Sequence, residues 1–435
     1  MKWKQSQGEI PEYIRKGDQE LSSAVQIVTS KFLSRISNGS HKVKRRYRYL
    51  PMVALETSQN TLATILADSN VRAVFPDIPT PLPGLQSTSM EGRQKLEQLS
   101  SFQDISQPSL STSVDLIGAN RVWAKGYTGA GWYVAILDTG IRRTHAFFQN
   151  KDIIEACFSD SDCPNGQDEM TGTGAATHHP SHYSGHDHGT HVSGIAAGRT
   201  DGSLNGVAKD ADLIAVNVFS TFEEDEWSGN YPAVLSYTSD QLAGLDFVYG
   251  LRDSHKIGGV NMSLGGGKKS CYCDGDPRKS AIDRLRDVNI PTSIATGNNS
   301  YCGAITAPAC ISTAIAVMAS DKTDAEASFS NWSSTLADIF APGVSILSST
   351  GDTDCSYEYW SGTSMATPHV TGALTLMRQF NPEASPEENL SKIKEHGPSI
   401  QTNCNSDESE IRVYADNVLH CPKKIPPCIL QLLLE

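Results

Sequence analysis

Three kinds of segment are missing from this chain, and each absence argues against a class of protein. No run of about 18 apolar residues occurs in the 435 residues, so we expect no transmembrane helix. The opening residues Met1–Glu9 contain no apolar core, so no secretory signal is visible at the recorded start. No Cys-x-x-Cys pair occurs, which disfavours a structural zinc site.

Positive charge is also scarce. The chain carries 36 basic and 49 acidic residues, a net charge of -13, so its composition gives no reason to expect nucleic-acid binding. The one basic run, His41–Arg48, resembles a localisation signal or a polyanion-binding patch. It lies between two strand-like stretches, and we interpret it as the solvated face of a small domain.

The chain does have a globular composition and many cysteines. With 38% hydrophobic and 7% aromatic residues, it is long enough for one large domain plus smaller pieces. Ten cysteines, an even number, predict an oxidising compartment and several disulfide bonds. Spacing suggests that Cys157 pairs with Cys163 and Cys302 with Cys310, and that Cys355 finds a C-terminal partner. The candidates for that partner are Cys404, Cys421 and Cys428, and spacing does not fix the connectivity.

Changes of pattern divide the chain into five parts. Residues 1–19 are polar, and residues 20–78 form a small α+β unit. Its predicted elements are strands at Val25–Val28, Met52–Leu55 and Val71–Phe75, and a helix around Leu62–Leu66. Prolines and a Ser/Gln-rich stretch make residues 79–112 a linker open to proteolysis. Residues 113–420 form the main domain, and residues 421–435 form a short tail that packs on it.

In the main domain, short apolar runs alternate with helical patterns, which is typical of an α/β domain with a mainly parallel sheet. The predicted strands are Tyr133–Leu137, Leu213–Val218, Gly259–Leu264, Thr292–Thr296 and Ala314–Ala319. The predicted helices are His188–Ala197, Asp240–Tyr249, Arg278–Asp287 and Met365–Met377. Ligand sites in such sheets lie outside the carboxyl ends of the strands. Asp138 and Asn298 follow two of those strand ends.

Three segments carry residue types suited to nucleophilic catalysis. Ser364 lies on the first turn of a predicted helix, where unpaired N–H groups can face an oxyanion, although an ordinary helix cap would look the same. Asp138 ends an apolar strand and suits the orienting acid, or else a turn residue. Asn298 suits an amide donor to an oxyanion, or else a plain turn.

Three histidines, His186, His188 and His191, compete for the role of the base. Their His-x-His and His-x-x-His spacings would also suit a metal. No His-Glu-x-x-His pattern accompanies them, and the small residues that follow favour a helix packed tightly on a sheet. We therefore disfavour the metal reading and assign no metal ligand.

Together these segments resemble the motifs of subtilases, the subtilisin-like and proteinase K-like serine peptidases. The family's three motifs match Asp138–Gly140, His188–Gly194 and Gly362–Pro368, in the subtilisin order. The resemblance covers residues 113–420 and implies a mainly parallel central sheet flanked by helices. It also implies a triad of Asp138, His188 and Ser364, with Asn298 as the side-chain oxyanion donor.

The resemblance implies further parts. Ser263, Leu264 and Gly265 match the strand that pairs with an extended substrate, and Ala295, Thr296 and Gly297 match the opposite wall of the first specificity pocket. Residues 20–78 resemble the family's inhibitory propeptide, a small ferredoxin-like α+β domain removed by self-cleavage. Catalysis would need no cofactor.

Structural calcium is common in the family, but the position of one early acidic ligand is Phe147 and the loop Arg199–Asn205 is short. That calcium site is therefore doubtful. The acidic insert Asp160–Glu169 could hold a hard cation, although a solvated loop is the simpler interpretation. We assign no calcium site.

We therefore predict a secreted serine endopeptidase that is made as a self-processing zymogen. Its partners would be protein or peptide substrates and its own propeptide as an intramolecular inhibitor, with no nucleic acid and no membrane, and it would be a monomer. The alternative is a catalytically inactive protein of the same fold that binds peptides, and an esterase or lipase is disfavoured by the order of the motifs.

Overall fold

The computed structural model describes residues 18–36, 41–83, 94–95, 110–200, 202, 204–223, 232–395, 397–404 and 408–416. Most of the predicted polar segment 1–19, most of the linker 79–112 and the whole tail 421–435 lie outside these ranges. Among the helices of the described ranges, none combines the length and apolar character needed to cross a membrane.

An eight-stranded sheet forms the centre of the main domain, in the order β16-β15-β13-β11-β5-β8-β6-β7. All neighbours pair in parallel except β6 and β7, which are antiparallel. The strands are β5 (Tyr133–Asp138), β6 (Ile153–Phe158), β7 (Glu169–Thr171), β8 (Asp212–Asn217), β11 (Ile257–Met262), β13 (Thr292–Ala295), β15 (Ile315–Ser320) and β16 (Ile339–Pro342). The predicted α/β fold with a mainly parallel central sheet is confirmed for the main domain.

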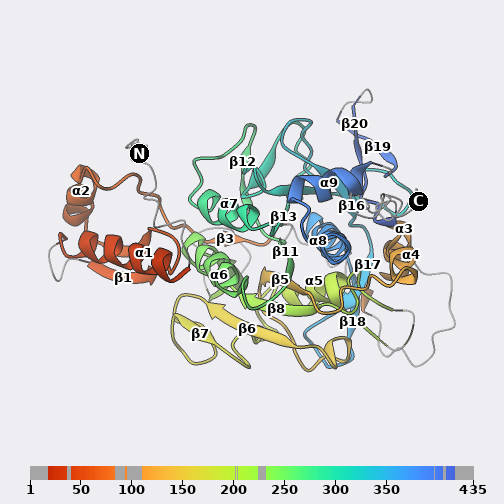
Figure 1. Ribbon diagram of the computed structural model, residues 1–435, viewed down its shortest axis with the longest axis horizontal. Helices are drawn as coiled ribbons and strands as arrows, with labels where there is room; N and C mark the ends of the chain where they lie inside the picture. The colour runs from red at the N-terminus through yellow and green to blue at the C-terminus, as the bar shows by residue number, and fades with distance from the viewer. Residues whose placement is uncertain are drawn as a thin grey trace, which may run out of the picture.

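Helices cover both faces of this sheet (Figure 1). Helices α5 (His188–Ala197) and α8 (Thr363–Phe380) lie on one face, and α6 (Thr238–Leu251) and α7 (Lys279–Asp287) lie on the other. Alternate side chains of a strand point to opposite faces. Val134 and Ile136 of β5 accordingly enter the core under α5 and α8, whereas Ala135 and Leu137 enter the core under α6.

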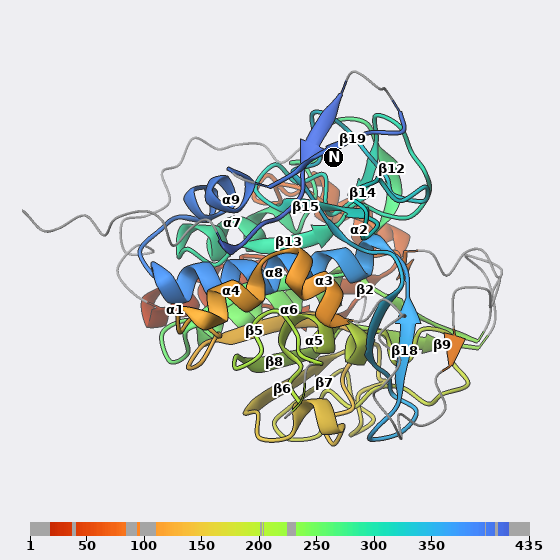
Figure 2. The same cartoon turned by 90° about the vertical axis from the view of Figure 1, so that its right-hand side faces the viewer.

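Shorter elements surround this body. Helices α3 (Leu110–Leu116) and α4 (Ala119–Ala124) lie over α8 (Figure 2), to which Ser113 Oγ is linked by a 2.8 Å bond with His369 Nε2. The remaining elements of the main domain are β9 (Ser220–Phe222), β10 (Ala233–Ser236), β12 (Gly266–Lys269), β14 (Ile305–Ala307), β17 (Ile346–Ser349), β18 (Tyr357–Trp360), α9 (Pro386–Lys394), β19 (Ser399–Gln401), β20 (Ser409–Ile411) and the 3-10 turn Ala146–Phe148. Strand β4 (Gln94–Lys95) pairs with β18.

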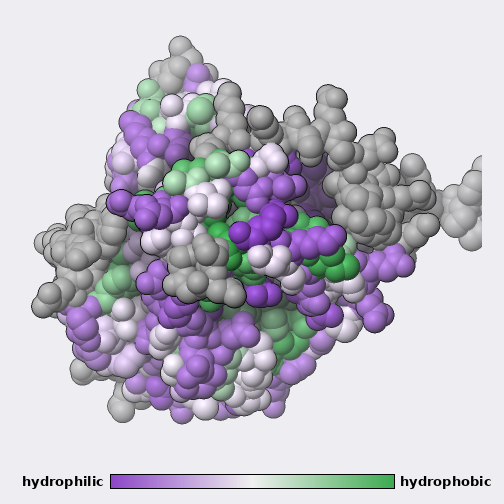
Figure 3. Space-filling view, turned by 90° about the vertical axis from the view of Figure 1, so that its left-hand side faces the viewer, coloured by the Kyte–Doolittle hydropathy of each residue, from purple (hydrophilic) through white to green (hydrophobic). Residues whose placement is uncertain are grey.

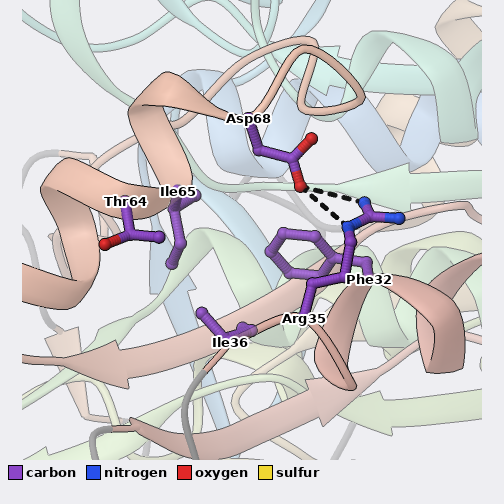
Figure 4. A pocket seen from close by; sticks show the side chains of 6 residues that line it. All are labelled: Phe32, Arg35, Ile36, Thr64, Ile65 and Asp68. Carbon is purple, nitrogen blue, oxygen red and sulfur yellow. Dashed lines mark hydrogen bonds and ion pairs between the residues drawn. The ribbon is translucent and has the colours of Figure 1, made fainter.

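The N-terminal unit contains α1 (Asp18–Leu33), β1 (His41–Arg46), β2 (Val53–Thr57) and α2 (Gln59–Ala67). Val25–Val28, predicted as a strand, lies inside α1, and Val71–Phe75 forms no strand. The basic run forms β1, which pairs with β2 in an antiparallel hairpin. Arg35 after α1 binds Asp68 after α2 at 3.0 Å, beside Phe32, Ile36 and Ile65 (Figure 4).

The N-terminal unit docks along α6, from Asp240 to Tyr249, through contacts that we call the docking interface. Arg45 is 6% exposed and donates to Asp240 Oδ1 at 2.6 and 2.9 Å. Asp246 accepts from the backbone N–H groups of Arg48 and Tyr49 at 2.6 and 2.9 Å. Tyr49 packs edge-on against Tyr249 with ring centres 5.1 Å apart. The basic run is thus partly buried against the main domain rather than solvated as predicted.

The described disulfides correct one predicted pair. Cys157 bonds to Cys163 as predicted, but Cys302 bonds to Cys404 and Cys273 bonds to Cys310. Spacing favoured the short loop for Cys302, whereas the fold brings the β19–β20 end of the chain onto the loop after β13. Cys355 is free and exposed among the described residues, while Cys421 and Cys428 lie outside them.

Candidate active site

The carboxyl end of β5 holds the first two candidates together. Asp138, the last residue of β5, is 1% exposed, and its Oδ1 accepts from His188 Nδ1 at 2.8 Å and from the Thr139 N–H at 2.8 Å. His188 is the first residue of α5, and Gly189 allows the close approach. A Cβ at Gly189 would lie 2.3 Å from the Gly140 carbonyl oxygen and 3.1 Å from Asp138 Cβ.

The geometry separates His188 from the other two histidines of its motif. The ring of His191 stacks on Trp360 at 4.3 Å, and its Nε2 is 3.1 Å from the Glu358 carbonyl, so its role is structural. His186 has no contact with Asp138 among the described hydrogen bonds, and its Nδ1 faces the Tyr183 carbonyl at 3.2 Å. His188 alone of the three binds the carboxylate that could orient a base.

Ser364 lies on the first turn of α8 and is 2% exposed. Its hydroxyl donates to the Ser263 carbonyl at 3.2 Å, and the Ser263 hydroxyl donates to the Ser364 carbonyl at 2.8 Å. Within the described part of the chain, no hydrogen bond joins Ser364 to His188. For Ser364 to give its proton to His188, its hydroxyl would have to rotate away from the Ser263 carbonyl. Such a change is common, because catalytic hydrogen bonds often form fully only when substrate binds.

Asn298 is held by the residue that precedes Ser364. Its Oδ1 accepts from the N–H and the hydroxyl of Thr363, both at 2.8 Å, which turns its Nδ2 in the opposite direction. A Cβ at Gly362 would lie 3.1 Å from that Nδ2 and 3.6 Å from the Ser364 nitrogen. The two N–H donors therefore flank one small space, as an oxyanion site requires. The orienting role of Thr363 was not predicted.

Asn331 is a second positioning residue that the sequence did not reveal. It is fully buried, and its Oδ1 accepts from the N–H groups of Asn299 and Tyr301 at 2.9 and 3.0 Å. Its Nδ2 donates to the Thr296 carbonyl at 2.8 Å. Gly297, with φ +102°, packs against that same amide group, where a Cβ would be 2.4 Å away. Asn331 thus fixes the loop that presents Asn298.

The predicted substrate-binding residues lie on both sides of this space. Ser263, Leu264 and Gly265 follow β11, and Ala295, Thr296 and Gly297 end and follow β13. The chain's own segment Thr80–Pro83 lies beside this space: β3 (Thr80–Pro81) pairs antiparallel with β10, a Cβ at Gly266 would lie 2.5 Å from the Thr80 side chain, and Leu82 is 1% exposed. Asn298 Nδ2 donates to the Pro83 carbonyl at 3.2 Å.

Another histidine on α8 is excluded from proton transfer. His369 is fully buried, and burial lowers its pKa to about 4, so it is neutral near pH 7. Its Nδ1 bonds to the Met365 carbonyl at 2.9 Å and its Nε2 to Ser113 Oγ at 2.8 Å. These bonds fix α3 on α8, which is a structural task.

The positions considered for calcium are occupied by other interactions. Phe147 is fully buried, and a Cβ at Gly198 would lie 2.5 Å from its ring, so this position offers no oxygen ligand. In the acidic insert, Asp162 accepts from the Thr221 N–H at 2.6 Å and Asp168 accepts from Ser161 at 2.8 and 2.9 Å. Lys44 of the N-terminal unit binds Asp160. Most residues of the insert are exposed, as expected for a solvated loop, while these acidic side chains already have partners within the protein.

Comparisons with known proteins agree with this geometry. The subtilase family model matches residues 129–402. An extracellular serine proteinase of a Thermus species is 31% identical over 341 residues, which cover 78% of this chain and 69% of that protein. An alkaline serine exoprotease A of Vibrio alginolyticus is 33% identical over 266 residues, covering 61% of this chain and 42% of that protein.

A solved structure of proteases from Pseudoalteromonas arctica is similar over 70% of this chain and 93% of that chain, with a TM-score of 0.56 and 26% identity. The chain spans about half the length of most of the curated relatives it matches. The family match nevertheless covers more than half of the present chain and contains Asp138, His188, Asn298 and Ser364. On these grounds the chain belongs to the subtilase family.

Proposed function

We propose that this chain is a serine endopeptidase with Ser364 as nucleophile, His188 as general base and acid, and Asp138 as the acid that orients His188. Ser364 Oγ attacks the scissile carbonyl while His188 Nε2 takes the hydroxyl proton. Asp138 keeps the other ring proton on Nδ1 and stabilises the imidazolium. Asn298 Nδ2 and the Ser364 N–H stabilise the oxyanion.

The tetrahedral intermediate then collapses. The bond to the leaving amine breaks, His188 returns the proton to that amine, and an ester joins the acyl group to Ser364. Water, deprotonated by His188, attacks the ester, the bond from the acyl carbon to Ser364 Oγ breaks, and His188 returns the proton to Oγ as the new carboxyl end is released. Main-chain pairing along Ser263–Gly265, and along β10 where β3 now pairs, suits extended peptides of many sequences.

The 2.8 Å contact between Asp138 Oδ1 and His188 Nδ1 is the observation that carries this proposal. It is tested by Ser364→Ala, assayed on unfolded protein and with a serine-directed phosphonate probe. By analogy with subtilisin, for which these magnitudes are known, we expect kcat to fall about 10⁶-fold for Ser364→Ala and about 10²–10³-fold for Asn298→Ala. An inactive peptide-binding protein would show no labelling and no turnover in the unmodified chain.

We further infer that residues up to Pro83 are an inhibitory prosegment. Asn298 binds the Pro83 carbonyl, so the prosegment occupies the place of a substrate acyl group. The N-terminal unit also has little core of its own. Of the six large hydrophobic side chains exposed in the described residues, five lie in it, and Figure 3 shows apolar areas among hydrophilic ones on its side of the molecule. The five side chains are Ile27, Val28, Leu66, Phe75 and Ile78.

The bond after Pro83 is the one that we expect Ser364 to cut during maturation, with Pro83 as the new carboxyl end and Gly84 as the new amino end. N-terminal sequencing and intact-mass measurement of the purified chain test this, with Ser364→Ala as the uncut control. A processed enzyme that begins elsewhere would refute this bond and leave the peptidase activity standing. Cleavage in Ser364→Ala would show that another protease acts.

Three described disulfides and the extracellular proteinase among the relatives support an extracellular site of action. The expected partners are protein or peptide substrates and the prosegment, and the active enzyme is expected to be a monomer. Catalysis would proceed without a cofactor. Structural calcium remains an expectation without an assigned site.

A further inference from the structure

Three side chains of metal-binding types meet beside the start of α5, outside the proposed triad. One ring nitrogen of His186, one carboxylate oxygen of Asp187 and one of Asp352 lie within 4.8 Å of one another. His186 is 6% and Asp187 3% exposed, whereas Asp352 is exposed on the loop between β17 and β18. The cluster therefore reaches solvent through Asp352.

Two buried atoms in this cluster have no hydrogen-bond partner. The 3.2 Å contact between His186 Nδ1 and the Tyr183 carbonyl requires the proton on Nδ1, and it leaves a lone pair on Nε2, which is buried and unpaired. Asp187 Oδ2 accepts from the Gly351 N–H at 3.2 Å, and Oδ1 is buried without a hydrogen-bond partner, 3.7 Å from His186 Nδ1. Such atoms are costly when left unpaired. Metal-binding histidines characteristically donate their other N–H to a carbonyl or carboxylate in this way.

Glycine at position 351 is what brings Asp352 to this place. A Cβ at Gly351 would lie 2.6 Å from Asp187 Cβ, so a larger residue would push the loop away. Arg142 donates to the Gly351 carbonyl at 2.9 Å, but its charge is paired with Asp354 at 2.7 Å. The two carboxylates of the cluster therefore keep an excess of negative charge.

We propose that His186, Asp187 and Asp352 bind a divalent transition-metal ion, represented by zinc. One imidazole and two carboxylates form a donor set that zinc accepts, with water in the remaining position. Two N or O atoms bound to one tetrahedral zinc ion lie about 3.4 Å apart, because each is about 2.1 Å from the metal. The ligand atoms here lie within 4.8 Å of one another, so the exposed Asp352 has to move by up to about 1.4 Å to bind the ion. This ligand set differs from the three-histidine pattern considered from the sequence, because His186 is the only one of those three histidines in the set.

The test uses the full-length chain carrying Ser364→Ala, which prevents self-digestion, and follows Zn²⁺ by calorimetry and thermal unfolding. We expect one saturable ion per chain and, at a hundred times Kd, an unfolding equilibrium constant lowered about 100-fold. His186→Ala and Asp352→Asn should each weaken binding at least tenfold. His182→Ala is the matched control, because His182 is an exposed histidine of the same loop whose ring lies 4.1 Å from that of Tyr183.

Absence of saturable binding would overturn the proposal, as would an equal loss in His182→Ala. Binding of Ca²⁺ in preference to Zn²⁺ would also contradict it. Asp352→Asn keeps the test decisive if His186→Ala fails to fold, because Asp352 is on the surface. None of these outcomes depends on whether the chain is a peptidase.

Discussion

The buried pair Arg45–Asp240 gives the sharpest prediction about the docking interface. In Arg45→Met the methylenes are kept but the guanidinium is lost, and Asp240, 2% exposed, stays buried without its ion-pair partner. Removing one member of a buried pair costs about 3–5 kcal/mol, and we take the lower end because Asp240 can accept a proton instead. About 3 kcal/mol corresponds to roughly a 10²-fold weaker docking of the prosegment.

The assay is the activity that appears when the processed complex is diluted into a fluorogenic peptide. The measured quantity is the protein concentration at which half of the full activity is released. In Arg45→Met this concentration should be about 10²-fold higher than in the unmodified chain. Arg35→Met is the matched control, because Arg35 pairs with Asp68 within the N-terminal unit and is 44% exposed. We expect it to leave the dilution curve nearly unchanged.

The double variant Arg45→Met/Asp240→Asn separates the pair from its surroundings. Removing the buried charge together with its partner should restore most of the lost docking. Arg45→Met with an unchanged dilution curve, or a double variant no better than the single one, would refute the reasoning. Thermal unfolding of the isolated processed enzyme would show whether Asp240→Asn harms the main domain itself.

Three further predictions concern pH, a disulfide and a glycine. Burial raises the pKa of Asp246 to about 6, so this carboxyl holds its proton more tightly when docked, and its contribution should weaken docking as pH rises through about 6. Tighter docking at about pH 8 than at pH 5 in the same dilution assay would contradict this. Cys404→Ser removes the disulfide that closes a loop of 102 residues. The free energy of unfolding should therefore fall by about 4–5 kcal/mol, and the melting temperature measured by calorimetry should fall by roughly 10 °C. An unchanged melting temperature would count against the bond. Gly189→Ala should lower kcat about 10²-fold, because the added methyl group displaces His188 from Asp138. Gly275→Ala is the control and should leave kcat unchanged, because a Cβ at Gly275 would meet open space. Equal rates in the two variants would exclude this steric role of Gly189.

The parallel sheet could be predicted because its central strands are short apolar runs, which the local sequence alone identifies as strands. Strand β6 was missed because Glu155 interrupts its apolar pattern. That carboxylate is 2% exposed and is satisfied by the N–H groups of Gly174 and Ala176, at 2.9 and 3.3 Å, and by Arg143 at 2.7 Å. Such compensation comes from other parts of the chain, so local pattern cannot show it.

The N-terminal unit shows the opposite failure. Val25–Val28 has strand-like composition, yet Leu21, Ala24 and Val25 are buried at helical spacing along α1. Over so short a run the β-branched residues suggested the wrong period. The candidate site could be predicted from its motifs. The roles of Thr363 and Asn331 could not, because both residues act through hydrogen bonds to residues far away in the sequence.

The three prolines that alternate along the prosegment, Pro79, Pro81 and Pro83, have a consequence for ligands of the cleft. Proline has no N–H, and successive residues of an extended strand direct their hydrogen-bonding groups to opposite edges. Thr80 and Leu82 can therefore donate along one edge, while the other edge carries acceptors only. A peptide with ordinary residues at the three proline positions would bring up to three more donors to the same walls. A tight competitive peptide ligand for this cleft should therefore depart from the chain's own sequence at these alternate positions.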